Sequence, residues 1–331
     1  MDQLLLLAAL TVAGTGLACA AGAAKETTIT PSAGSNSAGG GSFTLYTYEG
    51  PEGTRRYKMY LPVKQSSKRA LIVMLHGCTQ DPDDFARGTR MNELADRAGF
   101  VVLYPEQAVT AHPLKCWTWY DAAHQKRGQG EPAIIAGMTL KVAAENGVDR
   151  NRIFLVGLSA GAAMAATLGA TYPDVYQAIA LHSGIAYNLV SAVPQALEAM
   201  RTPKGDAKTL GAAVVNAMGE RRRVVPVLIL QGSADASVNH ANATLLAAQW
   251  ANANGFGDVA PHQEQMGKPP TYPVARSVYK SKGKTVVELW MIQGLAHAWS
   301  GGSKAGTYTD ERGPDAGHAI VNFFQEVENN R

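Results

Sequence analysis

The chain has 331 residues, of which 46% are hydrophobic and 17% charged, and its formal net charge is +3. This length provides enough apolar sequence for a large core in one domain or two. A charge so close to neutral argues against a protein that binds nucleic acid. Beyond the N-terminus, no stretch of sequence is long and apolar enough to cross a bilayer, so we expect no stable membrane span.

The first 24 residues resemble a signal peptide. Residues 4–10 form an apolar core, and Ala18-Cys19-Ala20 fits a small-x-small cleavage site. The first three residues carry no positive charge, however, and a buried N-terminal helix is the alternative. Cys19 could also be lipidated, although Gly16 stands where a lipobox usually has leucine. We predict a secreted or periplasmic protein, with a lipoprotein anchored through Cys19 as the second form of export.

Residues 25–42 are rich in Thr, Ser, Gly and Ala and predict a flexible linker, followed by one folded domain over residues 43–331. Cleavage after Ala20 would leave two cysteines, Cys78 and Cys116. An even pair in an oxidising compartment suggests one disulfide, whereas two buried thiols are expected if the protein stays in the cytosol.

The rest of the chain alternates between predicted strands and helices. Residues 43–48 and 56–61 flank a Gly-Pro-Glu-Gly turn and predict a hairpin. Further strands are expected at 70–76, 100–104, 152–156, 176–182, 224–230, 272–279 and 285–292, and helices at 83–98, 132–146, 162–170, 240–254 and 315–327. Residues 105–130 are irregular. Residues 191–223 interrupt the alternation of strands and helices, and we expect them to form an excursion above the sheet. This order predicts an α/β fold with a mostly parallel, doubly wound sheet and helices on both faces.

One turn carries the candidate chemistry. Residues 157–161, Gly-Leu-Ser-Ala-Gly, stand between an apolar strand and a helix-forming segment, which is the context of a nucleophile elbow. In so sharp a turn, a Cβ at Gly157 or Gly161 would collide with the neighbouring backbone. The pentapeptide also occurs by chance in plain loops, but this strand and helix favour Ser159 as a nucleophile.

A serine hydroxyl needs a base to take its proton and a third group to orient that base. On this fold the acid and then the histidine follow the serine, in loops at the carboxyl ends of later strands. Asp235 follows the strand at 224–230 and fits the acid, although an Asp in a turn is common. His297 follows the strand at 285–292 and fits the base. Its rival, His318, falls inside the last predicted helix.

An oxyanion hole needs two backbone N–H groups aimed at the developing negative charge. Ala160, directly after the serine, supplies one of them, and the other should come from the loop after an early strand. His76, Gly77 and Cys78 follow the strand at 70–75, so the amide of Cys78 is the second candidate. For His76 we expect a structural, hydrogen-bonded ring. This chemistry requires no metal or cofactor, and we expect none.

Together, five segments resemble the esterase family of poly(3-hydroxybutyrate) depolymerases; they are residues 76–80, 116–120, 157–161, 232–235 and 294–299. The resemblance implies an α/β-hydrolase fold and a secreted carboxylic-ester hydrolase. It implies Ser159, Asp235 and His297 as the catalytic triad, the amides of Cys78 and Ala160 as the oxyanion hole, and a disulfide between Cys78 and Cys116. Polymer depolymerases of this family usually carry an added polymer-binding domain, and we expect none after the predicted domain of this chain. We therefore expect soluble oligomers rather than crystalline polyester as substrate.

We therefore predict a serine esterase that hydrolyses short hydroxyalkanoate oligomers or polyesters through an acyl-enzyme. Trp117, Trp119, Tyr120 and Trp299 are expected at the rim of the site, where they would form an apolar platform for the ester chain. Loop packing is the plain alternative for each of them. The alternative functions are a feruloyl or acetyl esterase acting on plant polysaccharide, an acyltransferase on the same fold, and a non-catalytic binder. The sequence leaves the oligomeric state open.

Overall fold

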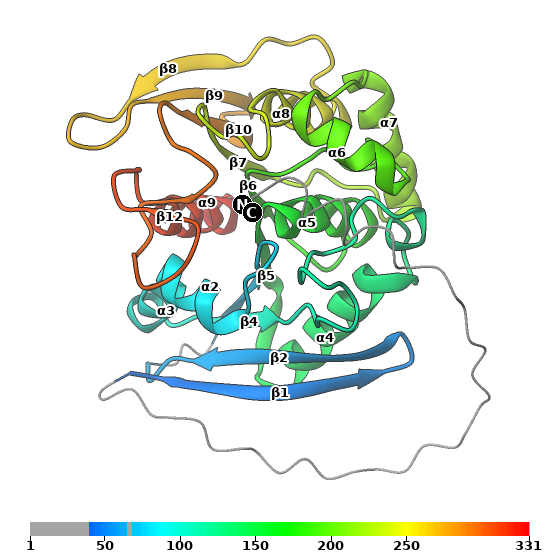
Figure 1. The fold of residues 1–331 in the computed structure, drawn as a ribbon, viewed down its shortest axis with the longest axis vertical. Helices are drawn as coiled ribbons and strands as arrows, with labels where there is room; N and C mark the ends of the chain where they lie inside the picture. The colour runs from blue at the N-terminus through cyan, green and yellow to red at the C-terminus, as the bar shows by residue number, and fades with distance from the viewer. Residues whose placement is uncertain (1–39, 65–67, 331) are drawn as a thin grey trace.

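A ten-stranded sheet forms the centre of the computed structural model, which describes residues 40–64 and 68–330 (Figure 1). The strands lie in the order β1-β2-β4-β3-β5-β6-β7-β10-β9-β8. Strands β4, β3, β5, β6, β7 and β10 run parallel, whereas β1, β2, β9 and β8 pair antiparallel at the two edges. The predicted signal peptide and most of the predicted linker lie outside the described residues.

The elements follow one another along the chain as a hairpin, then alternating strands and helices. Their order is β1 (Ser42–Gly50), β2 (Gly53–Leu61), β3 (Arg69–Leu75), α2 (Pro82–Thr89), α3 (Met91–Ala98), β4 (Val101–Pro105), the 3-10 helix η1 (Ala122–His124), α4 (Gly130–Glu145), β5 (Val148–Leu158), α5 (Ala160–Thr171), β6 (Ile179–His182), α6 (Val193–Arg201), α7 (Ala207–Met218), the 3-10 helix η2 (Gly219–Arg221), β7 (Val227–Gly232), α8 (Ala241–Ala253), β8 (His262–Met266), β9 (Val274–Ser281), β10 (Lys284–Ile292), β11 (Trp299–Ser300), β12 (Thr309–Asp310) and α9 (Ala316–Asn329).

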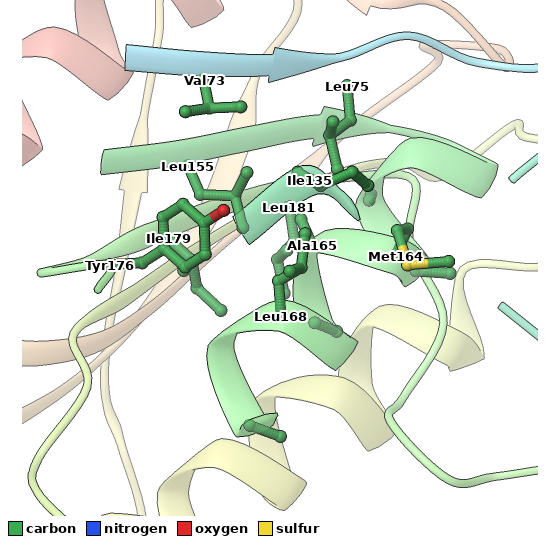
Figure 2. Packing of buried hydrophobic residues seen from close by; sticks show 14 of the residues in the cluster. Val73, Leu75, Ile135, Leu155, Met164, Ala165, Leu168, Tyr176, Ile179 and Leu181 are labelled. Atoms are coloured by element: carbon green, nitrogen blue, oxygen red, sulfur yellow. The ribbon is translucent and has the colours of Figure 1, made fainter. Parts of the chain in front are cut away.

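Both faces of the sheet are buried, which explains the continuous apolar runs of its central strands. In β3, Leu71, Val73 and Leu75 pack into one core, while Ile72 and Met74 pack into the core on the opposite face. Figure 2 shows Val73 and Leu75 in the first of these cores, to which Met164, Ala165 and Leu168 of α5 also belong. Each side chain of this kind stabilises the fold by about 1.5–3 kcal/mol through burial.

Helices cover the two faces in separate groups. Residues of α4, α5, α7 and α8 belong to one core, and residues of α2, α3 and α9 belong to the other (Figure 1). All residues of α5 are buried, so this helix lies inside the molecule rather than on its surface. The predicted α/β fold, with a mostly parallel sheet and helices on both faces, is confirmed. In the described part of the chain, no helix has the length and apolarity that a membrane crossing needs.

The structure corrects two details of the sequence-based prediction and adds a third. The helix expected over residues 83–98 is two helices, because Arg90 adopts a left-handed conformation with φ 56° and separates α2 from α3. The linker expected over residues 25–42 overlaps the sheet, since β1 begins at Ser42 and the N–H of Gly41 donates to the Tyr60 hydroxyl at 2.8 Å. The excursion over residues 191–223 contains α6 and α7.

Candidate active site

Ser159 occupies a strained turn at the carboxyl end of β5. Its φ of 58° and ψ of −121° lie outside the regions that side chains usually adopt. A Cβ on Gly157 would lie 2.2 Å from the Gly161 carbonyl oxygen, and one on Gly161 would lie 2.2 Å from the Leu75 carbonyl oxygen. The two glycines therefore permit the close approach of β3, β5 and α5 that this turn requires.

Ser159, His297 and Asp235 form a hydrogen-bonded chain. The Ser159 Oγ lies 3.0 Å from the His297 Nε2, and the His297 Nδ1 lies 2.8 Å from the Asp235 Oδ2. The two partner loops meet because β7 and β10 are parallel neighbours, with Gly232 paired to Ile292 at their carboxyl ends. Three side chains from distant parts of the sequence thus converge with the geometry that a serine nucleophile, its base and an orienting acid need.

The Asp235 carboxylate is held on both of its oxygens. Oδ1 accepts the N–H groups of Ser237 and Val238 at 2.9 and 2.8 Å, and Oδ2 accepts the Gln231 amide at 3.0 Å in addition to His297. Burial by itself would raise the pKa of Asp235, but the hydrogen bonds from His297 and the backbone outweigh burial and keep that pKa below its ordinary value. The carboxylate is therefore ionised at neutral pH. Sequence reasoning missed Gln231, which lies inside β7.

Two backbone amides next to the serine are available to a ligand. Among the described residues, neither the N–H of Cys78 nor that of Ala160 donates a hydrogen bond within the protein. Both residues line the same pocket as Ser159, and a Cβ on Gly77 would lie 3.5 Å from the Ser159 Cβ. Ala160 is the first residue of α5, where amides are unpaired and the helix dipole favours negative charge.

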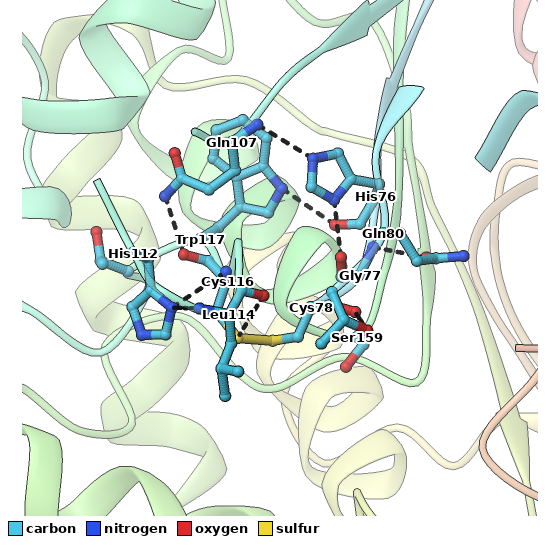
Figure 3. Close-up of a disulfide and its surroundings, with 12 residues drawn as sticks. His76, Gly77, Cys78, Gln80, Gln107, His112, Leu114, Cys116, Trp117 and Ser159 are labelled. Atoms are coloured by element: carbon cyan, nitrogen blue, oxygen red, sulfur yellow. Dashed lines mark hydrogen bonds between the residues drawn. A yellow bond between two sulfur atoms is a disulfide. The ribbon is translucent and has the colours of Figure 1, made fainter. Parts of the chain in front are cut away.

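The loop that carries Cys78 is fixed by two buried side chains. Gln80 Oε1 accepts the Gly77 N–H at 3.0 Å, and His76 Nδ1 lies 2.7 Å from the Gly77 carbonyl oxygen (Figure 3). Because His76 Nε2 accepts the Gln107 N–H at 3.1 Å, the imidazole proton is on Nδ1 and is donated to Gly77. Burial lowers the pKa of His76 to about 4, so the ring is neutral. His76 thus has the structural role expected from the sequence.

A disulfide between Cys78 and Cys116 ties this loop to the segment after β4 (Figure 3). The same two segments are joined by the Thr79 N–H, which donates to the Leu114 carbonyl at 2.6 Å, and by the Trp117 indole, which donates to the His76 carbonyl at 3.1 Å. The pairing agrees with the one implied by the family resemblance.

We expect the Cys78→Ala/Cys116→Ala double variant to lose about 3–4 kcal/mol of unfolding free energy, the value of the chain-entropy model for a sequence separation of 38. Urea unfolding of the two proteins measures the difference. Mass spectrometry of the intact protein, purified from an oxidising compartment, provides the check on the bond itself. Two free thiols in that material would contradict the pairing.

Beside Ser159 lies a pocket of about 390 Å³ whose walls are mainly apolar. Its large side chains include Leu114, Trp119, Tyr120, Ile185, Leu197 and Met200. Trp119 and Tyr120 thus lie in the wall of the pocket beside Ser159. Most of the other wall residues come from α6 and from loops that the sequence analysis did not single out, because apolar residues of these types are equally common in a core.

The prediction that Trp117 and Trp299 lie at the rim is wrong. Both are fully or almost fully buried, at 0% and 1% exposure, and neither lines the pocket. Trp117 lies under the Cys78 loop, and Trp299 stacks on His182 with 5.4 Å between ring centroids. His318, the rival base, lies on α9 and hydrogen-bonds to Asp315 Oδ2 instead of approaching Ser159.

His182 connects the turn at Ser159 to the segment that follows His297 through two hydrogen bonds. Its carbonyl accepts the Ser159 N–H at 2.9 Å, and its Nε2 accepts the Ser300 N–H at 3.2 Å. Burial lowers the pKa of His182 to about 3, helped by the neighbouring His297. His182 therefore remains neutral, like His76.

We expect the free energy of unfolding to fall as the pH drops below about 6.5. In the unfolded chain His76 and His182 take up protons from about that pH downward, whereas in the folded protein they stay neutral to about pH 4 or lower. Since the unfolded state then binds more protons, each histidine costs about 3 kcal/mol of stability at pH 4. Urea unfolding at pH 7.5 and pH 4 measures the loss.

The matched variants for this test are His182→Gln, which should lose less stability on acidification, and His262→Gln, which changes an exposed histidine of the edge strand β8 and should behave as the parent. Equal unfolding free energies at the two pH values would contradict the assignment of two buried neutral histidines.

The sequence and the fold are similar to those of several known proteins. Residues 55–267 match the family model described as esterase PHB depolymerase. Poly(3-hydroxyalkanoate) depolymerase C of Paucimonas lemoignei is 30% identical over 246 residues, which cover 72% of this chain and 57% of that protein. Feruloyl esterase B of Neurospora crassa is 36% identical over 138 residues, which cover 41% of this chain and 46% of that protein. The chain thus spans about half the length of these curated relatives.

A solved structure shares the fold. The acetyl xylan esterase from Aspergillus awamori matches with a TM-score of 0.70 at 19% sequence identity, over 86% of this chain and 99% of that one. At this level of identity the likeness concerns the fold, and the site must be argued from its own residues.

Proposed function

The chain belongs to the esterase family of PHB depolymerases, and we propose that it hydrolyses carboxylic esters with Ser159 as nucleophile, His297 as base and Asp235 as the orienting acid. The observation that carries this proposal is the hydrogen-bonded chain from Ser159 Oγ through His297 to the buried Asp235 carboxylate. The family is one of esterases, which agrees with the chemistry that this arrangement supports.

In the proposed reaction, Ser159 Oγ attacks the ester carbonyl carbon while His297 Nε2 takes its proton. The carbonyl oxygen becomes negatively charged and accepts hydrogen bonds from the amides of Cys78 and Ala160. The C–O bond then breaks, and the alcohol leaves with the proton from His297. Water, activated by the same histidine, releases the acid from the acyl-enzyme.

Asp235 acts through His297 in this scheme. Its carboxylate accepts a hydrogen bond from Nδ1–H, which keeps the ring proton on Nδ1 and leaves Nε2 as the acceptor that faces Ser159. It also stabilises the imidazolium that forms while the serine proton resides on the ring. Because the backbone of Ser237 and Val238 holds the opposite carboxylate oxygen, the acid is oriented before substrate arrives.

For the substrate we propose esters of short hydroxyalkanoate oligomers. The relative from Paucimonas lemoignei is named a poly(3-hydroxyalkanoate) depolymerase. The apolar pocket beside Ser159, with Trp119 and Tyr120 in its wall, suits a short aliphatic acyl chain. The second candidate is a feruloyl or acetyl ester of plant polysaccharide, because other relatives are named feruloyl esterase B and acetylxylan esterase A.

Export of the protein is part of the proposal. A disulfide such as Cys78–Cys116 persists in oxidising compartments and is rare in the cytosol, which supports a secreted or periplasmic location. The signal peptide predicted over residues 1–24 remains a prediction.

Labelling with a fluorophosphonate probe, followed by peptide mapping, tests the proposed nucleophile directly, and we expect a single adduct on Ser159. Rates on p-nitrophenyl esters of increasing acyl length, hydroxybutanoate dimers, feruloyl sugars and acetylated xylan then rank the substrates. We expect the highest kcat/KM with the hydroxybutanoate dimers. Activity confined to the sugar esters would favour the polysaccharide esterase, and transfer of the acyl group to an added alcohol in preference to water would favour the acyltransferase.

A further inference from the structure

Tyr308 brings an aromatic ring from a distant loop to the proposed base. This half-buried side chain lines the pocket beside Ser159. Its ring packs edge-on against the His297 imidazole, with 6.2 Å between the ring centroids and an interplanar angle of 75°. Since His297 Nε2 lies 3.0 Å from Ser159 Oγ, the Tyr308 ring borders the space in which an ester bound at Ser159 would react.

The hydroxyl group of Tyr308 reaches the loop that carries Cys78. It lies 3.3 Å from Thr79 Oγ1, and Thr79 Oγ1 donates to the Cys78 carbonyl at 2.6 Å. Because a threonine hydroxyl has only one proton, Tyr308 is the donor in the first of these contacts. Tyr308 thus contacts His297 with its ring and, with its hydroxyl, the residue next to one of the two amides proposed as the oxyanion hole.

The backbone on both sides of Tyr308 is held by other segments. The Tyr308 carbonyl accepts the N–H of Trp299, which follows His297 by two positions, at 2.6 Å. On the other side, Asp84 Oδ1 of α2 accepts the Thr307 N–H at 3.0 Å. These contacts hold Tyr308 at φ 51°, a left-handed conformation that is costly for a bulky residue. The ring is therefore placed before a substrate binds.

The chemistry of ester cleavage decides which half of the ester lies at Tyr308. In the proposed reaction the carbonyl oxygen faces the amides of Cys78 and Ala160. When the acyl C–O bond breaks, the alcohol leaves with the proton from His297, so the alkoxy oxygen must lie within hydrogen-bond reach of Nε2. The alcohol half therefore begins at His297. Among the ring contacts of the described residues, His297 packs against Tyr308, which also lines the pocket.

We propose that Tyr308 is a specificity-determining residue that contacts the alcohol half of the ester. This inference rests on the proposed function and adds which half of the substrate this side chain recognises. In a 3-hydroxyalkanoate oligomer, the carbon that bears the alkoxy oxygen also carries an alkyl branch, and an aromatic ring offers apolar surface to such a branch. Esters of branched hydroxy acids should gain from this contact, whereas the alcohol half of a methyl ester is too small to do so.

The test compares two neutral esters that share the same acyl group, methyl butanoate and the butanoate ester of methyl 3-hydroxybutanoate. Release of butanoate is measured by chromatography, and the readout is the kcat/KM of the larger ester divided by that of the methyl ester. The intrinsic reactivities of the two esters cancel when this ratio is compared between variants. Tyr308→Ala should lower the ratio roughly tenfold relative to the parent, the size of effect that an apolar contact with part of a substrate has.

Two further variants separate the ring from the backbone and from the hydroxyl group. Tyr308→Asn should lower the ratio in the same way, because asparagine adopts positive φ readily and so preserves the turn. Tyr308→Phe should keep the parent ratio, because it retains the ring. The matched control is Tyr272→Ala. Tyr272 donates to Asp310 of the same loop at 3.1 Å but does not line the pocket, so this variant should also keep the parent ratio.

A second measurement distinguishes contact with the alcohol from positioning of His297. The alcohol has left before water attacks the acyl-enzyme, whereas His297 acts in both steps. Burst kinetics with p-nitrophenyl butanoate give the acylation and deacylation rate constants separately. We expect Tyr308→Ala to keep the deacylation rate constant of the parent. Circular dichroism checks that each variant is folded.

An unchanged ratio in folded Tyr308→Ala and Tyr308→Asn proteins would overturn the role of Tyr308 and leave the proposed esterase function standing. The same holds if acylation by both esters and deacylation all slow by one common factor, because Tyr308 would then act through His297. Cleavage of p-nitrophenyl esters without cleavage of either butanoate ester would also overturn it. Absence of both fluorophosphonate labelling and ester cleavage in the parent would instead reject the proposed function itself.

Discussion

Ser159→Ala should lower the kcat of ester hydrolysis by roughly 10⁶-fold, as is found when the serine of a catalytic triad is removed. The substitution deletes the nucleophile and one hydrogen bond to His297 Nε2, which faces the pocket. The backbone strain at φ 58° is the same for alanine as for serine, so the fold should be unaffected. Steady-state kinetics on p-nitrophenyl esters and thermal unfolding by circular dichroism measure the two effects.

Ser281→Ala is the matched control, because Ser281 is an exposed serine at the end of β9 and should retain full activity. Fluorophosphonate labelling should disappear in the Ser159 variant and persist in the control. A folded Ser159→Ala protein with a tenth of the parent activity would refute the assignment of the nucleophile.

Asp235→Asn should reduce kcat by roughly 10⁴-fold, the loss associated with a triad whose acid is replaced by its amide. The backbone N–H groups of Ser237 and Val238 require an acceptor, so the asparagine oxygen should take that position and turn its NH₂ group toward His297. His297 Nδ1 must then accept, which moves the proton to Nε2 and removes the acceptor for the serine proton. The amide also meets the donor of Gln231.

The control for this variant is Asp258→Asn, because Asp258 is highly exposed and pairs only with the exposed Lys208 among the contacts of the described residues. Activity of the two variants is compared on the same p-nitrophenyl ester, with urea unfolding to separate a loss of stability from a loss of turnover. An Asp235→Asn protein that is stable and within tenfold of the parent kcat would show that another group orients the base.

The elements that the sequence predicted well are those in which burial imposes a pattern. The central strands are apolar throughout because helices cover both of their faces. Such continuous apolar runs predict a parallel sheet from the sequence alone. β8 was missed because it is an edge strand of polar residues, His262–Met266, that pairs only with β9 in the described part of the chain. A strand without a buried face has no apolar alternation to recognise.

The break between α2 and α3 escaped prediction for a different reason. Residues 83–98 have the composition of one amphipathic helix, and nothing in the local sequence marks Arg90 as left-handed. The structure shows Phe85 and Met91 buried on either side of the break, in the core that α9 also covers. Packing against these neighbours decides where the helix ends, and propensity alone cannot anticipate it.

The turn at Ser159 and the order of Ser159, Asp235 and His297 could be predicted before the structure, because a Gly-x-Ser-x-Gly segment between an apolar strand and a helix, and the ends of apolar strands, are local patterns. Which aromatic and apolar side chains face the pocket depends on how distant segments pack together, and this could be known from the folded structure alone. Trp119 lines it and Trp117 lies beneath it, although the two stand two positions apart in one segment. The place of Met200 in the wall likewise depends on the packing of α6 against α8, where the Asn242 side chain donates to the Met200 carbonyl. Such contacts join residues far apart in the chain, and the hydrophobic effect that forms them is non-directional, so the same residue types serve a core or a pocket equally well.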